Sequence, residues 1–91
     1  MSQSGLTITL YGRPGCHLCD DVEQSIRRIG EKIPLVLDVI DIHSDTALLE
    51  KYMFTIPVVA INGEEVFVSV HAVVTEQELW QECERRSRET R

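Results

Sequence analysis

The feature that most constrains the fold of this sequence is a strand-like run that stops at a turn and leads straight into a helical pattern. Residues 6–11 (LTITLY) alternate and are rich in β-branched side chains, as β-strands are. Glycine and proline in residues 12–15 then predict a turn. From Cys19 to Ile29 apolar residues recur at helical spacing, with acidic residues early and basic residues late, which suits the helix dipole. The chain therefore opens with a strand, a turn and a helix.

A second strand is predicted at residues 35–42, where the chain is almost continuously apolar. Such a run is typical of a strand that is covered on both faces and has a parallel neighbour. The first strand, helix and second strand form a βαβ unit, whose crossover is right-handed and makes the two strands parallel. Ser44 or Asp45 can then cap a short helix that continues to Tyr52.

The second half of the chain carries a hairpin signal and a final helix. The strand-like runs VVAI and EEVFVSV flank Asn62-Gly63, a dipeptide that favours a two-residue hairpin turn. Thr75 and Glu78 form a capping box that opens a last helix. The order β-α-β-α-β-β-α predicts an α/β fold with a mixed four-stranded sheet flanked by helices. At 91 residues the chain forms one domain, 1–91, with a core over about residues 6–86 and a frayed basic tail.

Charge and cysteine content narrow the possible function classes. A formal net charge of −6 disfavours nucleic acid as a partner, because an acidic surface repels phosphates. No segment resembles a signal peptide or approaches a membrane span, so we expect a cytoplasmic protein without a membrane partner. Three cysteines, an odd number, make a poor framework of structural disulfides. A close cysteine pair in a reducing compartment is more often catalytic or metal-binding.

The close pair is Cys16 and Cys19, and its position suits redox chemistry. The thiolate is the nucleophile in disulfide exchange, and the N-terminus of a helix favours that anion. Cys16 falls at the start of the predicted helix, and Arg13 adds positive charge nearby. We predict that Cys16 attacks a disulfide and that Cys19, one turn further along, resolves the mixed disulfide. His17, between the cysteines, is a candidate for tuning the thiolate.

Taken together, these motifs resemble a known family. The strand–Cys-x-x-Cys–helix opening, the Thr55-Ile56-Pro57 segment before the third strand, and the closing hairpin and helix look like a glutaredoxin-like member of the thioredoxin superfamily. The stretches YGRPGCHLCDD and DIHSDTALLEKYMFTIPVVAINGEEVF resemble in particular the small bacterial glutaredoxin-like proteins with a Cys-His-Leu-Cys motif. The resemblance covers residues 6 to about 86. It implies a thioredoxin-like fold of the glutaredoxin type and a thiol–disulfide oxidoreductase that uses a dithiol/disulfide couple.

The resemblance also implies where a substrate binds and which partners the protein has. In the superfamily the peptide bond before the proline that matches Pro57 is cis, and its loop faces the cysteine pair. The backbone of Thr55 and Ile56 would then pair with a bound thiol substrate as a short extra strand. Together with Arg13 these residues form the predicted substrate site. Expected partners are protein or small-molecule disulfides, with glutathione or a thioredoxin-type reductant for recycling; we expect a monomer and no bound cofactor.

Two departures from the family concern the substrate. Glutaredoxins that use glutathione carry a pair of glycines and then an acid after the fourth strand, whereas residues 69–74 here read SVHAVV. Glutathione is therefore expected as a thiol co-substrate that lacks the usual partners for its γ-glutamyl end. Thioredoxins keep a buried acid six residues before the first cysteine, and here Leu10 occupies that position.

Two other functions are compatible with the sequence. One is a redox-inert adaptor on the same scaffold, because a fold does not guarantee chemistry. The other is binding of a metal or an iron–sulfur cluster, which would need a second subunit or an outside thiol because the chain has one cysteine pair and no assigned metal site. Cys83 is predicted as a small core residue. The aromatic residues Tyr52, Phe54 and Phe67 are predicted to pack rather than to bind.

Overall fold

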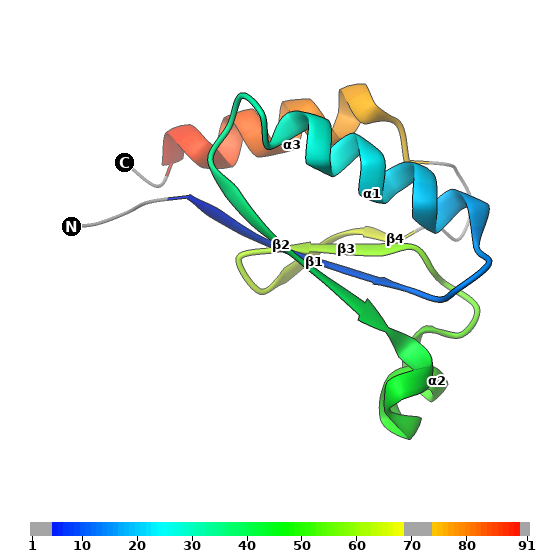
Figure 1. The fold of residues 1–91 in the computed structure, drawn as a ribbon. Coiled ribbons are helices and arrows are strands. Elements are labelled where there is room, and N and C mark those ends of the chain that lie inside the picture. The colour runs from blue at the N-terminus through cyan, green and yellow to red at the C-terminus, as the bar shows by residue number, and fades with distance from the viewer. Residues whose placement is uncertain (1–4, 69–73, 90–91) are drawn as a thin grey trace.

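The computed structural model describes residues 5–68 and 74–89, which form a four-stranded sheet and three α-helices (Figure 1). In chain order the elements are β1 (Leu6–Gly12), α1 (His17–Ile29), β2 (Leu35–Asp41), a short 3₁₀ helix η1 (Ile42–Ser44), α2 (Thr46–Tyr52), β3 (Val58–Ile61), β4 (Glu64–Val68) and α3 (Glu76–Glu89). This order confirms the predicted succession of strands and helices, to which η1 is an addition.

The sheet is mixed, as predicted, with the strand order β2-β1-β3-β4. β1 runs parallel to β2 and antiparallel to β3, and β3 and β4 form the predicted hairpin. Asn62 and Gly63 at its turn have φ values of 53° and 88°, the left-handed conformation that a tight hairpin turn requires. The turn is tied to β1 because the Thr7 amide donates to the Asn62 side chain at 2.9 Å.

Two helices cover one face of the sheet and the third lies at one end of the opposite face. α1 and α3 run alongside each other over the sheet, whereas α2 projects from the far end of β2 (Figure 1). The main core lies under α1 and α3, and its fully buried members include Leu6, Ile8, Leu10, Ile26, Val59, Ile61 and Leu79. A smaller cluster of Ile42, Tyr52 and Val58 lies under α2. Burial of these apolar side chains is the main force that holds the layers together.

The prediction that the second strand is covered on both faces is wrong. β2 is an edge strand, and Val36 and Val39 are 66% and 45% exposed. Leu35 and Leu37 do pack against the core below α1, and the parallel pairing with β1 is confirmed. The other face of β2 stays open because α2 covers only the end of the sheet beside Ile42. Charged residues such as Asp38 on an exposed edge discourage pairing with another chain.

The helix ends follow the predicted capping residues. The Asp45 carboxylate accepts the Ala47 amide at 2.7 Å and begins α2. Thr75 and Glu78 form the reciprocal capping box of α3, with hydrogen bonds of 3.0 and 3.1 Å. α3 continues to Glu89, further than the frayed tail predicted from Arg85.

The basic end of α3 stays helical because Arg86 is paired. Its guanidinium donates to Glu82 one turn back at 2.6 Å and to Glu64 on β4 at 3.2 Å. Ion pairs within the helix and from helix to sheet thus hold the last turns in place. Over the described residues, none of the helices has the length and apolar character needed to cross a membrane.

Candidate functional site

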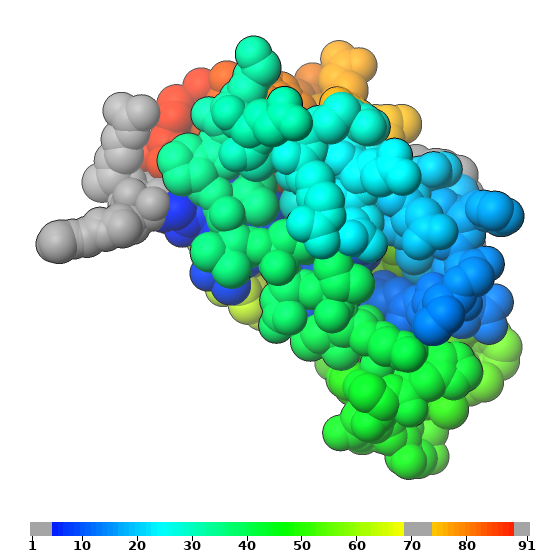
Figure 2. Space-filling view, in the orientation of Figure 1, coloured from blue at the N-terminus to red at the C-terminus, as the bar shows by residue number. Residues whose placement is uncertain are grey.

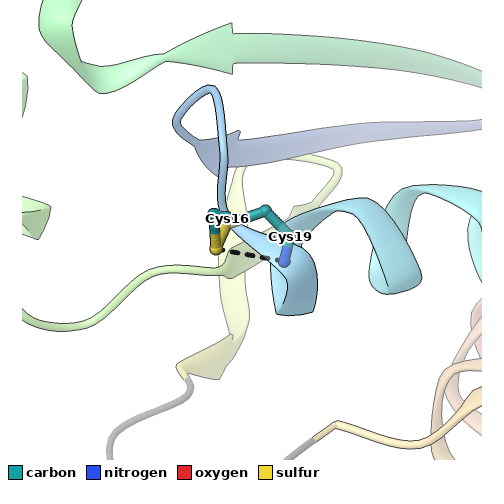
Figure 3. Close-up of a disulfide and its surroundings, with 2 residues drawn as sticks. All are labelled: Cys16 and Cys19. Carbon is teal, nitrogen blue, oxygen red and sulfur yellow. Dashed lines mark hydrogen bonds between the residues drawn. A yellow bond between two sulfur atoms is a disulfide. The ribbon is translucent and has the colours of Figure 1, made fainter.

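Cys16 and Cys19 form a disulfide at the start of α1, with their Cα atoms 5.2 Å apart (Figure 3). Cys16 has extended backbone angles and is the N-cap residue of the helix. Its sulfur accepts a hydrogen bond from the Cys19 backbone amide at 3.2 Å (Figure 3). The N-cap role is usually filled by an oxygen of Ser, Thr, Asp or Asn. Here the sulfur of Cys16 fills that role. At this position the first amides of the helix and the helix dipole favour a negative charge on the sulfur.

The two cysteines differ in their access to solvent. Cys19 begins the buried stripe of α1 that continues through Val22, Ile26 and Ile29, and it is only 5% exposed. Cys16 lies one turn earlier, outside that stripe, and is only partly buried. The side chain of His17 is exposed on the first turn of the helix. This arrangement leaves one sulfur partly accessible to solvent and one that the fold shields.

The segment Thr55-Ile56-Pro57 lies at the same end of the sheet as the cysteine pair. Tyr11 pairs with Val58, so the chain leaving β1 toward Cys16 lies beside the chain entering β3 from Pro57. In the space-filling view the blue segment around the cysteines borders the green segment of α2 and the loop that follows it (Figure 2). The Ile56–Pro57 bond is cis, which agrees with the geometry implied by the resemblance.

The backbone groups of Thr55 and Ile56 differ in their hydrogen bonding. The Thr55 amide donates to the Tyr52 carbonyl at 2.9 Å, and the Thr55 hydroxyl donates to the same carbonyl at 3.3 Å. Within the described part of the chain the Ile56 backbone makes no such turn or loop hydrogen bond. Its side chain packs against the cluster under α2. The Thr55 amide is therefore satisfied within the turn, whereas the Ile56 main-chain groups have no partner of this kind among the described residues.

The prediction that Phe54 is a packing residue is wrong, because its side chain is 84% exposed. The turn closed by Thr55 and the Tyr52 carbonyl directs residues 53 and 54 away from the core. Met53 and Leu18 are also exposed at this end of the molecule. Tyr52 and Phe67, by contrast, pack as predicted. Exposed apolar side chains thus lie on two segments at this end of the molecule. Leu18 lies between the two cysteines, and Met53 and Phe54 lie in the loop after α2.

Arg13 is exposed three residues before Cys16, in the turn between β1 and α1. Across residues 5–68 and 74–89 it takes part in no ion pair, whereas the arginines of α1 and α3 pair with neighbouring carboxylates. Gly15 in the same turn has a φ of +80°, which a residue with a side chain rarely adopts. The turn therefore carries an exposed cation, unpaired among the described residues, three positions before Cys16.

A polar cluster that the sequence analysis missed anchors α2 and the loop behind it. The Tyr52 ring stacks on Tyr11, with centroids 4.5 Å apart, and the Tyr52 hydroxyl donates to Glu65 on β4. Lys51 lies 3.4 Å from the same carboxylate. Burial is the largest cause that raises the pKa of Tyr52, and the hydrogen bond to Glu65 is the second. The same hydrogen bond is the largest cause that lowers the pKa of Glu65. Residues 11, 51, 52 and 65 carry no shared motif, so only the fold reveals this contact.

The third cysteine lies apart from the site. Cys83 is fully buried in the main core, as predicted, and burial raises the pKa of its thiol from 9.0 to about 11. Near neutral pH it is therefore a protonated, shielded thiol and a poor nucleophile.

Substitution of Cys83 by alanine should leave thiol–disulfide exchange unchanged. The raised pKa also gives a pH dependence: the stability associated with the neutral thiol is complete below pH 9 and is lost as the pH rises toward about 11. The loss of unfolding free energy between pH 9 and 11 should therefore be smaller in Cys83→Ala than in the wild type, by about 1–2 kcal/mol. Denaturant titrations of both proteins across this pH range measure the difference. Loss of exchange in Cys83→Ala would contradict a two-cysteine site.

The cysteine pair, the turn that carries Arg13 and the segment before β3 lie at the same end of the sheet. Residues 69–73, most of the stretch that replaces the family's glycine pair, lie outside the described residues. In the part of the chain that is described, no three His, Cys, Asp or Glu side chains are grouped so that they could hold a metal ion. Leu10 is buried in the core where thioredoxins have an acid.

Comparison with known proteins gives one family and a set of similar folds. The model of the Glutaredoxin-like domain (DUF836) matches residues 7–86. Protein Ne2328 from Nitrosomonas europaea is 24% identical, with a TM-score of 0.72 over 91% of this chain and 96% of its own. A mutant thioredoxin from Halobacterium salinarum is 20% identical, with a TM-score of 0.70 over 92% of this chain and 76% of its own. No curated protein matches the sequence. The fold is thioredoxin-like.

Proposed function

The chain belongs to the glutaredoxin-like domain family, and we propose that it is a thiol–disulfide oxidoreductase whose working couple is Cys16 and Cys19. The observation that carries the proposal is the disulfide at the N-terminus of α1, with one partly accessible sulfur and one shielded sulfur. Such asymmetry separates the sulfur that meets the substrate from the sulfur that completes the reaction. We further propose that the protein acts as a monomer in the cytoplasm.

The proposed reaction is a two-step exchange. The Cys16 thiolate attacks one sulfur of a substrate disulfide, so that a bond forms between Cys16 and that sulfur and the other sulfur leaves as a thiolate. The Cys19 thiolate then attacks the Cys16 sulfur and releases the second substrate thiolate. The substrate gains two electrons, two protons from water complete its thiols, and the protein is left with the disulfide. Two equivalents of a reducing thiol return the protein to the dithiol by the reverse exchange and leave joined as a disulfide.

Each group at the site has a part in these steps. The helix N-terminus and the Cys19 amide stabilise negative charge on the Cys16 sulfur as the attacking thiolate of the first step. Ile56 offers main-chain groups that can hold a substrate segment beside Cys16 as a short extra strand. Leu18 and Phe54 add exposed apolar surface for the residues next to a protein disulfide. We therefore favour protein or peptide disulfides as substrates, with glutathione as the recycling thiol.

The experiment that tests the function mixes reduced protein with a stoichiometric amount of a peptide that contains one internal disulfide. After acid quench and alkylation, intact mass is expected to show the peptide as a dithiol and the protein as a Cys16–Cys19 disulfide, in equal amounts. A peptide that stays oxidised while both cysteines of the protein are alkylated would contradict the proposal. The same mixture with oxidised glutathione tests whether the small disulfide also reacts.

We propose that Arg13 attracts the anionic glutathione, and its replacement tests this contact. Replacement by alanine should slow the reaction with oxidised glutathione about two- to fivefold at low salt, because an exposed charge contributes about 0.5–1 kcal/mol toward an anionic ligand. The reaction with an uncharged small disulfide should not change, and added salt should remove the difference. Stopped-flow thiol assays give both rates.

Lys32→Ala is the matched control for Arg13→Ala. Lys32 is exposed beyond the C-terminal end of α1 and, like Arg13, takes part in no ion pair of the described residues. Its loss changes the net charge equally but at the end of α1 remote from Cys16. If both substitutions slow the reaction with oxidised glutathione equally, the effect comes from net charge, and the proposed contact between Arg13 and glutathione is wrong.

A further inference from the structure

Gly12 lies directly against the sulfur of Cys19. It is the last residue of β1, it is buried, and it pairs with Asp41 on β2. A Cβ atom placed on Gly12 would stand 3.0 Å from the Cys19 sulfur and 3.1 Å from the Cys19 Cβ. These distances are shorter than ordinary van der Waals contacts between such atoms. Any side chain at position 12 would therefore press on the shielded cysteine.

The backbone at Gly12 does not itself call for glycine. The glycines with positive φ in the described residues are Gly15 and Gly63, and Gly12 is not among them. Glycine inside a strand carries an entropic cost and often marks a place where another group approaches closely. The group that approaches here is the disulfide. Glycine at position 12 is therefore explained by the close approach of Cys19 and not by the backbone conformation.

We propose that Gly12 is a positioning residue for the resolving thiol, because its missing side chain provides the space in which the Cys19 sulfur sits when it is bonded to Cys16. This inference deepens the proposed function and rests on it. In the disulfide the Cys19 sulfur is fixed by its bond to Cys16 and cannot turn away from position 12. In the dithiol the sulfur is free to rotate about the Cα–Cβ bond and relieve the closer of the two contacts. A methyl group at position 12 therefore penalises the oxidised protein more than the reduced protein.

The expected effect is a change in the redox equilibrium. The reaction is protein dithiol plus oxidised glutathione giving protein disulfide plus two glutathione molecules, so two electrons pass from the protein to glutathione. In Gly12→Ala the equilibrium constant should fall about tenfold, which for a two-electron couple raises the reduction potential by about 30 mV. The second exchange step should slow as well, so the mixed disulfide of Cys16 with glutathione should live longer than in the wild type.

The matched control is Gly5→Ala, in the residue just before the other end of β1. A Cβ on Gly5 would stand 3.3 Å from the Pro34 carbonyl oxygen, a comparably close contact that is remote from the cysteines. This substitution can lower the stability of the domain in both redox states, but it should leave the equilibrium with glutathione as it is in the wild type. The comparison separates an effect on the couple from an effect on β1.

The test is the redox equilibrium of wild type, Gly12→Ala and Gly5→Ala in glutathione buffers, read by alkylation and intact mass. A shift in Gly12→Ala alone supports the inference. No shift, or an equal shift in Gly5→Ala, overturns it and leaves the proposed function standing. A wild type without any two-electron transition overturns the proposed function itself. Should Gly12→Ala fail to fold, the double variant Gly12→Ala/Cys19→Gly, which removes both the sulfur and the Cβ that the new methyl group would meet, is expected to fold; a double variant that is also unfolded overturns the inference.

Discussion

Replacement of Cys16 by serine is expected to abolish disulfide exchange. A serine hydroxyl can still cap α1 as an acceptor for the residue 19 amide, so the fold should be retained. A neutral hydroxyl, however, does not attack a disulfide at neutral pH, and the buried Cys19 is poorly placed to meet a substrate. The rate should fall roughly a thousandfold or more, the scale on which loss of a nucleophile acts in other enzymes. Turnover of a peptide disulfide with glutathione as reductant measures it.

Cys83→Ala is the control for Cys16→Ser, since it also removes one thiol but does so inside the core. Thermal unfolding of both variants checks that each is folded. Exchange that persists in a folded Cys16→Ser protein would show that another group attacks the substrate, and the assignment of Cys16 as nucleophile would be wrong.

Replacement of Cys19 by serine is expected to trap the mixed disulfide. Cys16 and its helix N-terminus remain, so the first exchange with oxidised glutathione should proceed. The second step lacks its thiol, and the adduct on Cys16 should accumulate to nearly one per protein where the wild type shows little. Intact mass before and after treatment with a strong dithiol reductant measures the adduct, which should disappear on reduction.

The trapping result also separates two mechanisms. If Cys19→Ser reduces a peptide disulfide as fast as the wild type, the buried cysteine has no part in that reaction and external thiol completes it. If the variant forms no adduct at all, Cys16 is not the attacking group. The two-step scheme is supported only if the adduct on Cys16 forms in Cys19→Ser and persists.

Local signals in the sequence were sufficient for most of the fold. Asn62-Gly63 forms the hairpin turn, and Thr75 with Glu78 forms the capping box, because both devices act within four residues. The cysteine pair was recognisable for the same reason, since a strand, a turn and a helix start place Cys16 at the helix N-terminus. The burial of Cys19 follows from helical periodicity, because Cys19 begins the apolar stripe of the helix.

Features that depend on distant contacts could not be predicted in this way. The exposure of β2 depends on which face of the sheet α2 covers, and an apolar run does not specify that. The exposure of Phe54 follows from the turn that Thr55 closes on the Tyr52 carbonyl. The contact between Gly12 and Cys19 joins a strand end to a helix face, and the sequence presents Gly12 as no more than the start of a turn.

The central claim is that Cys16 and Cys19 form a reversible redox couple. The most direct test is a redox titration of the purified, metal-free protein across glutathione buffers, quenched with an alkylating agent and read by intact mass. A two-electron transition confined to these two cysteines, in the range of about −180 to −270 mV found for dithiol oxidoreductases, is the predicted result. If both cysteines instead alkylate as ordinary thiols in every buffer, the claim is contradicted, and an adaptor or cluster-binding role becomes the better account.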